Sequence, residues 1–216
     1  MVYFDTETTG LNCFSCNVIE LAMLSVEFGD IIDEYDKFIR VGRPLPQKII
    51  NLTGIDDDML NTQGEDERTV AQDLKKRIEW ADIMIAHNAQ FDLSFIYNML
   101  RRHFPDEVEG LVRNVSWIDT LTVVKDRKKY PHRLDNVVEY YDIGEFNFHR
   151  AIDDTRALYK VTQKMKKERD DLKKYCNVFG FNPKYGVSGI NFKFIQYKSQ
   201  DFHNGKVDDD KILPLL

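Results

Sequence analysis

An apolar run that ends in two acidic residues opens the chain: Val2-Tyr3-Phe4-Asp5-Thr6-Glu7-Thr8-Thr9-Gly10-Leu11. The aromatic residues before Asp5 favour a short strand, and Gly10 is typical of the turn after it. Because alternate side chains of a strand share a face, Asp5 and Glu7 should point the same way. Two such carboxylates repel each other unless a cation lies between them, and a divalent metal that prefers oxygen ligands would fit. A solvated strand end explains the pair about equally well, so both interpretations stay open.

The composition indicates a single domain of ordinary size. The 216 residues are 43% hydrophobic and 31% charged, which suffices for a sizeable core and a well-solvated surface. A net charge of -6 and a pI near 5.4 argue against a large basic surface that binds nucleic acid. They do not argue against a small basic border around an acidic pocket. No signal peptide or membrane-spanning run is visible, so we expect a soluble, cytoplasmic protein with no membrane partner.

The three cysteines predict no disulfide framework, and their odd number favours a reducing compartment. Cys13 and Cys16 have the spacing of a metal or redox pair, and Cys176 lies far from both. A structural zinc site needs two more ligands than this pair offers. A redox pair usually opens a helix, whereas this one lies in a predicted loop. We therefore predict no function for the pair.

The order of the predicted elements is that of an α/β domain with a mixed sheet. A meander of three strands comes first, followed by alternating helices and strands. After the first strand, the predicted strands are 18–26, 31–41, 82–86 and 115–118. The predicted helices are a short one at about 49–54, then one from about 68, and those at 89–103, 120–129, 134–141 and 151–175; residues 56–68 are predicted to be rich in loops.

The character of the chain changes after about residue 175. Several glycines and Pro183 break the pattern there, a strand is predicted over 190–197, and an acidic run follows at 208–210. We therefore predict a domain over residues 1–175 and a C-terminal extension of unknown role over residues 176–216.

Two further acidic residues lie on the buried stripes of predicted helices. Asp92 is aligned with Phe95 and Met99, and Asp154 with Leu158. A carboxylate on a buried stripe is costly unless it is paired or binds a cation. A first-turn acid stabilised by the helix dipole could explain either case alone. Both cases together with Asp5 and Glu7 favour a cation site instead.

Four carboxylates suit two divalent cations, which at a separation of about 3.5–4 Å stabilise both oxygens of a phosphoryl displacement. Such a site needs a base for the attacking water. His149 lies five residues before Asp154, and an imidazole titrates near neutrality. A solvated surface histidine is the alternative, but the nearness to Asp154 favours the catalytic interpretation.

Three motifs in register resemble the DEDDh 3′–5′ exonucleases, the family of the proofreading epsilon subunit of bacterial DNA polymerase III and of the exonuclease insert of its Gram-positive counterpart. The motifs are Asp5–Leu11, His87–Asp92 and His149–Thr155, and Leu52–Ile55 is similar to an intervening family segment. The resemblance covers about residues 1–175. A histidine in the third motif is typical of the DEDDh branch.

The resemblance implies an RNase H-like fold, with a mixed five-stranded sheet flanked by helices. It also implies two divalent cations, Mg²⁺ or Mn²⁺, and a histidine general base. The implied metal ligands are Asp5, Glu7, Asp92 and Asp154, and the implied base is His149. The implied contacts to the 3′-terminal nucleotide are Thr8, Leu11, Asn88 and Phe91, with Leu52 and Thr53 as weaker candidates. Leu11 and Phe91 could hold a base without reading its identity, since apolar and stacking contacts tolerate any base.

The expected function is metal-dependent hydrolysis of single-stranded nucleic acid or frayed 3′ ends, with DNA favoured and nucleoside 5′-monophosphates released. A DNA polymerase is a possible partner. One alternative is an RNA-trimming enzyme similar to oligoribonuclease, and another is a catalytically idle module that binds nucleic acid or docks on a polymerase. The basic cluster of 125–129, His132 and Arg133 could guide a phosphate backbone, although a solvated helix face explains it better.

Overall fold

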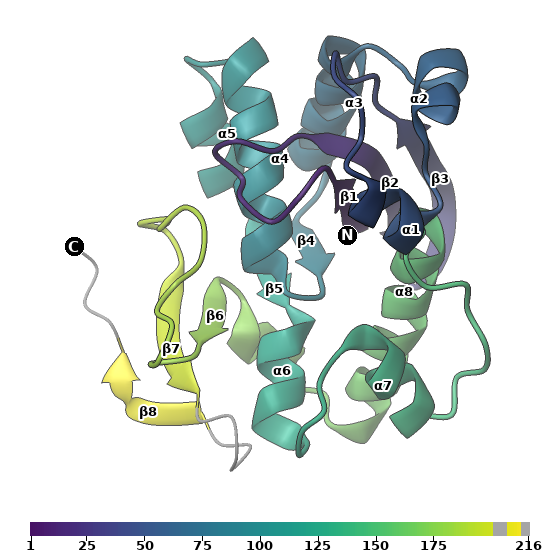
Figure 1. Ribbon diagram of the computed structural model, residues 1–216. Coiled ribbons are helices and arrows are strands. Elements are labelled where there is room, and N and C mark those ends of the chain that lie inside the picture. The colour runs from purple at the N-terminus through teal and green to yellow at the C-terminus, as the bar shows by residue number, and fades with distance from the viewer. Residues whose placement is uncertain (201–206, 213–216) are drawn as a thin grey trace.

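The computed structural model describes residues 1–200 and 207–212. Within them, one eight-stranded sheet of order β3-β2-β1-β4-β5-β6-β7-β8 runs through the molecule, with helices on both faces of its central part (Figure 1). The strands are β1 (Val2–Thr8), β2 (Val18–Glu27), β3 (Asp30–Phe38), β4 (Ile83–Ala86), β5 (Ser116–Asp119), β6 (Val178–Phe181), β7 (Gln196–Gln200) and β8 (Val207–Ile212).

The helices follow the alternating order that the sequence predicts. They are α1 (Gln47–Thr53), α2 (Asp57–Gln63), α3 (Glu67–Trp80), α4 (Ala89–His103), α5 (Val108–Arg113), α6 (Thr120–Arg127), α7 (Leu134–Tyr140) and α8 (Ala151–Glu168), with a 3₁₀ turn η1 (Leu172–Tyr175). The predicted mixed sheet is confirmed. Strands β1 to β3 pair antiparallel, and β4 to β6 follow β1 in parallel.

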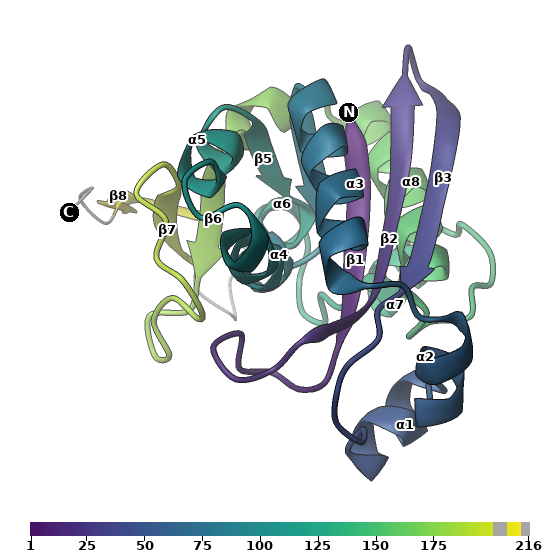
Figure 2. The same ribbon diagram turned by 90° about the horizontal axis from the view of Figure 1, so that it is seen from above.

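The parallel strands bring several loops to one edge of the sheet. Val2 of β1 lies beside Met84, so β4 ends at Ala86 while β1 runs on to Thr8. The carboxyl ends of β1, β4, β5 and β6 all lie at this edge, because these strands run the same way. The loops after β1 and β6 project from it, at the lower side of Figure 2. This edge is where the acidic residues of the first strand lie.

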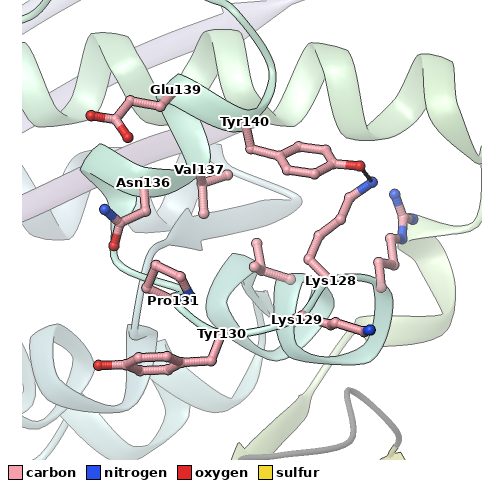
Figure 3. A pocket seen from close by; sticks show the side chains of 10 residues that line it. Lys128, Lys129, Tyr130, Pro131, Asn136, Val137, Glu139 and Tyr140 are labelled. Carbon is pink, nitrogen blue, oxygen red and sulfur yellow. Dashed lines mark hydrogen bonds between the residues drawn. The ribbon is translucent and has the colours of Figure 1, made fainter.

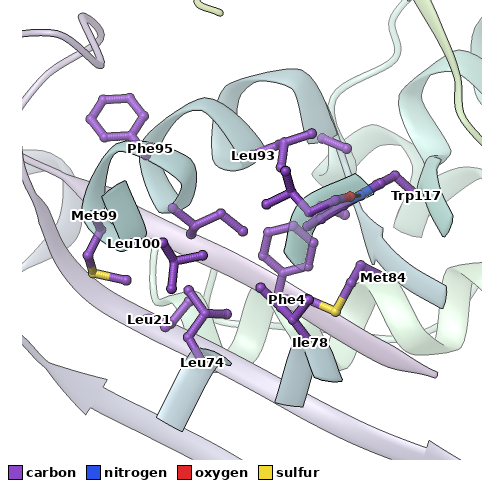
Figure 4. Packing of buried hydrophobic residues seen from close by; sticks show 14 of the residues in the cluster. Phe4, Leu21, Leu74, Ile78, Met84, Leu93, Phe95, Met99, Leu100 and Trp117 are labelled. Carbon is purple, nitrogen blue, oxygen red and sulfur yellow. Dashed lines mark hydrogen bonds between the residues drawn. The ribbon is translucent and has the colours of Figure 1, made fainter. Parts of the chain in front are cut away.

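Two apolar cores cover the two faces of the sheet. On one face Phe4 packs edge-on against Trp117, with a ring-centroid distance of 5.9 Å, in a core to which α3 and α4 also contribute apolar residues (Figure 4). On the other face Tyr3 packs with Leu158 and Val161 of α8. Because the side chains of β1 alternate between the faces, Asp5 and Glu7 lie on the α8 face, as Tyr3 does.

The prediction of a loop-rich segment at 56–68 is wrong, because α2 occupies part of it. The carboxylate of Asp56 accepts a hydrogen bond from the Met59 amide at 2.8 Å and caps this helix. Leu60 is buried against Ile19 and Ile55. One well-placed cap and one apolar anchor therefore hold a short, mostly polar helix.

The prediction that the last helix reaches residue 175 is wrong, since α8 ends at Glu168. The guanidinium of Arg127 donates to the carbonyl oxygens of Met165 and Arg169 at 2.8 and 3.2 Å. The Met165 carbonyl oxygen also accepts from the Arg169 backbone N–H at 3.0 Å, so Arg127 adds a second hydrogen bond at the last carbonyl groups of the helix.

The C-terminal extension continues the sheet that the domain begins. Strand β6 pairs with β5, and β7 pairs with β6, both in parallel. The predicted strand over 190–197 is only partly right, because β7 begins at Gln196. Phe192 and Ile195 before it pack into the α4 core as part of a loop. The acidic run 208–210 lies in β8, and residues 201–206 and 213–216 of the extension lie outside the described residues.

Candidate functional site

Three of the four predicted acidic residues form one group. Each of Asp5, Glu7 and Asp154 offers a carboxylate oxygen, and these oxygens all lie within 4.8 Å of one another. Asp5 and Glu7 come from the carboxyl half of β1, and Asp154 from the first turn of α8, which covers that face. The structure therefore brings three of the four predicted side chains together, and their role as metal ligands stays a prediction.

The carboxylate of Asp154 is buried, and only one of its two oxygens has a hydrogen-bond partner. It is 9% exposed, and its Oδ2 accepts a hydrogen bond from the His149 backbone N–H at 3.1 Å. Its Oδ1 is buried and has no hydrogen-bond partner among the described residues. A buried, unpaired carboxylate oxygen next to two more carboxylates is the donor set that a divalent cation takes. The residues present therefore fit the implied metal.

Asp92 approaches the group from the other face of the sheet. Its Oδ1 accepts from the Thr6 backbone N–H at 3.1 Å and from the Thr6 hydroxyl at 2.6 Å. Strand β4 ends at Ala86, so Thr6 has no strand beside it on that side, and Asp92 takes the place of the missing partner. It lies outside the group of three but next to Asp5.

Burial is the main cause that raises the pKa of each of the four predicted acidic residues, and the charges of neighbouring carboxylates add to it. Burial, and then the charges of Asp92 and Asp154, raise the pKa of Asp5 well above its ordinary value of 3.8. Burial, followed by the charge of Asp154, raises the pKa of Glu7 to about 8. Burial also raises the pKa of Asp92 and of Asp154 to about 7 each, although hydrogen bonds from Thr6 and from the His149 N–H oppose the shift. Without a cation these carboxyl groups tend to stay protonated, and a bound divalent cation would favour their charged forms.

We expect the metal-free protein to lose stability as the pH rises from 6 to 8.5. The folded-state pKa values of about 7–8 exceed the ordinary values of 3.8 and 4.5, so the folded state binds more protons than the unfolded state in this range. Deprotonation of these buried groups in the folded state should cost about 2 kcal/mol, which would lower the melting temperature by about 4–8 °C. Calorimetry in EDTA measures this, and Mn²⁺ should reduce the difference. A melting temperature that rises over the same range would contradict it.

His149 lies in the same pocket as two of the acids. A cavity of about 100 Å³ is lined by Asp5, Asp154 and His149, together with His87, Arg133, Leu134, Asp135 and Phe148. The backbone of His149 is left-handed, with φ 71°, a conformation that costs a non-glycine residue energy and is often found at functional sites. Its N–H bond to Asp154 holds this conformation.

Sequence reasoning missed Glu20, which is fully buried opposite Glu7 on β2. Its Oε1 accepts from Arg150 Nη2 at 3.0 Å, and its Oε2 accepts from the Ala151 N–H at 3.0 Å. Glu20 thus anchors the residues between His149 and Asp154 to the sheet. The available signal was a lone acid inside the apolar run of the second strand.

Asp119 and His87 were missed as supporting residues. Asp119 Oδ1 accepts from the backbone N–H groups of Asn88 and Ala89 at 2.9 and 3.2 Å, which fixes the start of α4. His87 Nε2 lies 2.9 Å from the His132 carbonyl oxygen, and burial lowers the pKa of its imidazole. An acid at the end of a predicted strand was the available signal for Asp119.

The predicted nucleotide contacts differ in exposure. Leu11, Leu52 and Asn88 are exposed, and Phe91 is half-buried with its ring 4.8 Å from that of Phe95. Thr8 and Thr53 are buried. Their hydroxyl groups donate to the carbonyl oxygens of Gly10 and Ile49, respectively. A nucleotide would therefore meet the first four before it met either threonine.

Two residues of the basic cluster, Arg127 and Lys128, belong to an ion network with the end of α8 rather than to a solvated helix face, whereas Lys129 is exposed. Arg127 and Lys128 line a cavity of about 680 Å³ between α6 and α7, where Lys128 reaches the Tyr140 hydroxyl at 2.9 Å (Figure 3). Both cations pair with Glu168, and Arg127 also pairs with Asp171. The side chain of Arg127 is 2% exposed. These two cations hold α6 to the end of α8.

A family model described as an exonuclease family, RNase_T, matches residues 2–162. The chain belongs to this exonuclease family. It is 40% identical over 173 residues to the PolC-type DNA polymerase III of Bacillus subtilis, and 34% identical over 163 residues to that of Thermotoga maritima. These matches cover 77% and 74% of the chain but only 11% of each relative. The chain therefore spans about a tenth of the length of the curated relatives it matches.

Solved structures of exonucleases share the fold. E. coli exonuclease I in complex with a dA16 oligonucleotide superposes with a TM-score of 0.72 at 18% identity, over 81% of this chain and 42% of that one. Exonuclease X in complex with 5′ overhanging duplex DNA gives a TM-score of 0.57 at 18% identity, over 78% of this chain and 92% of that one. The predicted RNase H-like fold is thereby confirmed. Among the described residues of the exonuclease fold, no helix is long and apolar enough to cross a bilayer.

Proposed function

We propose that this chain hydrolyses nucleic acid from the 3′ end, with DNA favoured, and releases nucleoside 5′-monophosphates. The observation that carries the proposal is the buried, unpartnered Oδ1 of Asp154, which lies with Asp5 and Glu7 beside His149. Membership of the exonuclease family supports the reaction class, and the three motifs support the direction. The intact acid set counts against an idle docking module.

In the proposed reaction, His149 accepts a proton from the attacking water. The water oxygen bonds to phosphorus, the bond from phosphorus to the 3′ oxygen breaks, and that oxygen takes a proton from solvent. Asp5, Glu7 and Asp154 would hold divalent cations, Mg²⁺ or Mn²⁺, with Asp92 completing a set for two. Bound cations would supply positive charge that stabilises the attacking and leaving oxygens. Leu11, Asn88 and Phe91 would hold the terminal nucleotide.

The relatives named DNA polymerase III suggest the setting in which the reaction takes place. We propose that the domain works on single-stranded or frayed 3′ ends next to a DNA polymerase, either joined to it or bound by it.

The test uses matched DNA and RNA oligonucleotides labelled at the 5′ end, with Mn²⁺ or with EDTA. A ladder that shortens by one nucleotide at a time in Mn²⁺, and is absent in EDTA, is the expected result. Faster cleavage of RNA would assign the chain to RNA trimming, since only a contact to the 2′-OH separates the two substrates. Full activity in EDTA would remove the basis of the proposal.

A further inference from the structure

One stretch of the chain differs from the rest in charge. Residues 176–200 contain no aspartate or glutamate, although the whole chain carries a net charge of -6. They include three lysines and several aromatic residues. Lysines interleaved with aromatic residues are the composition that single-stranded nucleic acid binds.

The topology brings part of this stretch to the edge that carries the acidic site. Strand β6 runs parallel to β5, so the loop that follows it at 182–189 emerges at the same edge as the loop at 9–17 after β1. In Figure 2 both loops project side by side from the lower side of the sheet, and Figure 1 also shows them as neighbours.

The side chain of Gln90, in the first turn of α4, forms hydrogen bonds with the extension. Its Nε2 donates to the carbonyl oxygens of Ser188 and Ile190 at 2.8 and 2.6 Å. Its Oε1 accepts from the Tyr197 hydroxyl at 2.8 Å. Gln90 directly precedes Phe91, so the extension is held beside a residue of the proposed nucleotide site.

The loop at 9–17 packs against the same helix and the same part of the extension. Asn98 of α4 donates to the Cys13 carbonyl oxygen at 2.9 Å. A Cβ atom on Gly189 would lie 3.7 Å from Cys13 Sγ and 2.4 Å from Ser94 Oγ, so the backbone of the extension passes close to both. The two loops therefore form one continuous surface.

Aromatic rings and unpaired cations lie on this surface. Phe14 is 69% exposed, and Tyr185 is 73% exposed with Lys184 Nζ 5.2 Å from its ring centroid. Arg43 donates to three neutral oxygens, those of Thr9, Ser15 and Asn17. Neither Arg43 nor Lys184 forms an ion pair with any described residue. We call Phe14, Arg43, Lys184 and Tyr185 the aromatic–cationic rim.

We propose that the aromatic–cationic rim binds the single strand of the substrate upstream of its 3′ end. This inference rests on the proposed function and extends it to the path of the strand. Phe14 and Tyr185 would stack on unpaired bases, and Arg43 and Lys184 would contact phosphates. A duplex would offer no free base faces to the two rings, so the rim selects for single strands.

The test compares cleavage of a trinucleotide with cleavage of a dodecanucleotide by the full chain. Tyr185→Ala should raise KM for the dodecanucleotide by about five- to twentyfold, because one stacked base is lost. It should leave kcat and the trinucleotide kinetics unchanged, since a trinucleotide is too short to span the acidic site and the rim. Lys184→Ala should also reduce the slope of the logarithm of the dodecanucleotide's association constant against the logarithm of salt concentration by about 0.7 in magnitude, because one phosphate contact is lost.

Phe28→Ala and Lys166→Ala are the matched controls. Phe28 is 99% exposed in the turn between β2 and β3, and Lys166 lies in the last turn of α8. Both residues lie away from the carboxyl edge, and neither substitution should change either substrate's kinetics. Equal losses for both substrate lengths in Tyr185→Ala, or no change for either, would overturn the inference.

Binding of the dodecanucleotide in EDTA separates this inference from the proposed function. A wild-type chain that binds it through the rim but never cleaves it would defeat the proposed function and leave the rim intact. A wild-type chain that cleaves it, with Tyr185→Ala and Lys184→Ala indistinguishable from it, would defeat the rim alone.

Discussion

Asp154→Asn should abolish cleavage and, at the same time, make the metal-free protein more stable. The amide keeps an oxygen that can accept the His149 N–H, and it places an N–H₂ group where Oδ1 now has no partner. It removes a negative charge from the neighbourhood of Asp5 and Glu7. We expect activity to fall about a thousandfold or more, because the proposed cation site loses a ligand. The melting temperature in EDTA at pH 8 should rise.

Asp153→Asn is the matched control for this substitution. Asp153 is the preceding residue in the same helical turn, but its Oδ1 pairs with Arg156 at 3.2 Å and not with the acidic group. Losing this pair should cost about 0.2–1 kcal/mol and leave cleavage within about twofold of wild type. Activity assays and calorimetry on both variants check the pair of results. An active Asp154→Asn enzyme would rule out Asp154 as a ligand.

His149→Asn should lower kcat by about 100- to 10,000-fold, the usual contribution of a general base, with KM changed much less. Asparagine tolerates the left-handed backbone that His149 adopts, and its N–H can still donate to Asp154. The variant therefore removes the imidazole and little else. The stabilisation of the protein by Mn²⁺ should be the same as in wild type, which separates the base from the metal ligands.

His103→Asn serves as the control for the loss of a histidine. His103 lies at the end of α4, where its Nε2 contacts Glu67 at 2.8 Å. Its replacement should leave kcat unchanged. Single-turnover cleavage of a labelled oligonucleotide measures the chemical step directly. If His149→Asn keeps the wild-type rate in that assay, another group takes the proton.

The sequence predicted the fold where periodicity and spacing carry the information. Asp5 and Glu7 share one face of a strand, and Asp154 lies on a buried helical stripe, so local periodicity predicts which face each occupies, and the three motifs predict that they meet. The separate position of Asp92 could not be predicted in this way. It depends on β4 ending short of β1, which is a matter of register between strands distant in sequence.

Other features that the sequence did not predict also depend on contacts between distant parts of the chain. Glu20 supports the site through contacts with residues 130 or more positions away, which no local pattern reports. The strands of the extension are short, and β6 contains Gly180, so their pairing depends on an existing sheet edge at β5 rather than on their own propensity. The domain boundary that we predicted at residue 175 rests on composition and stays a prediction, and strands on both sides of it belong to one sheet.

That shared sheet has a consequence for the tendency of the chain to aggregate. Strand β5 is flanked on its outer side by β6, and Trp117 of β5 donates its backbone N–H to Asn177 Oδ1 at 2.8 Å. Without residues 176–200, β5 would present unpaired backbone groups and an apolar flank to other molecules, the arrangement that recruits foreign strands and leads to aggregation. The extension therefore also covers the β5 edge of the sheet that carries the acidic site and protects it from pairing with other chains.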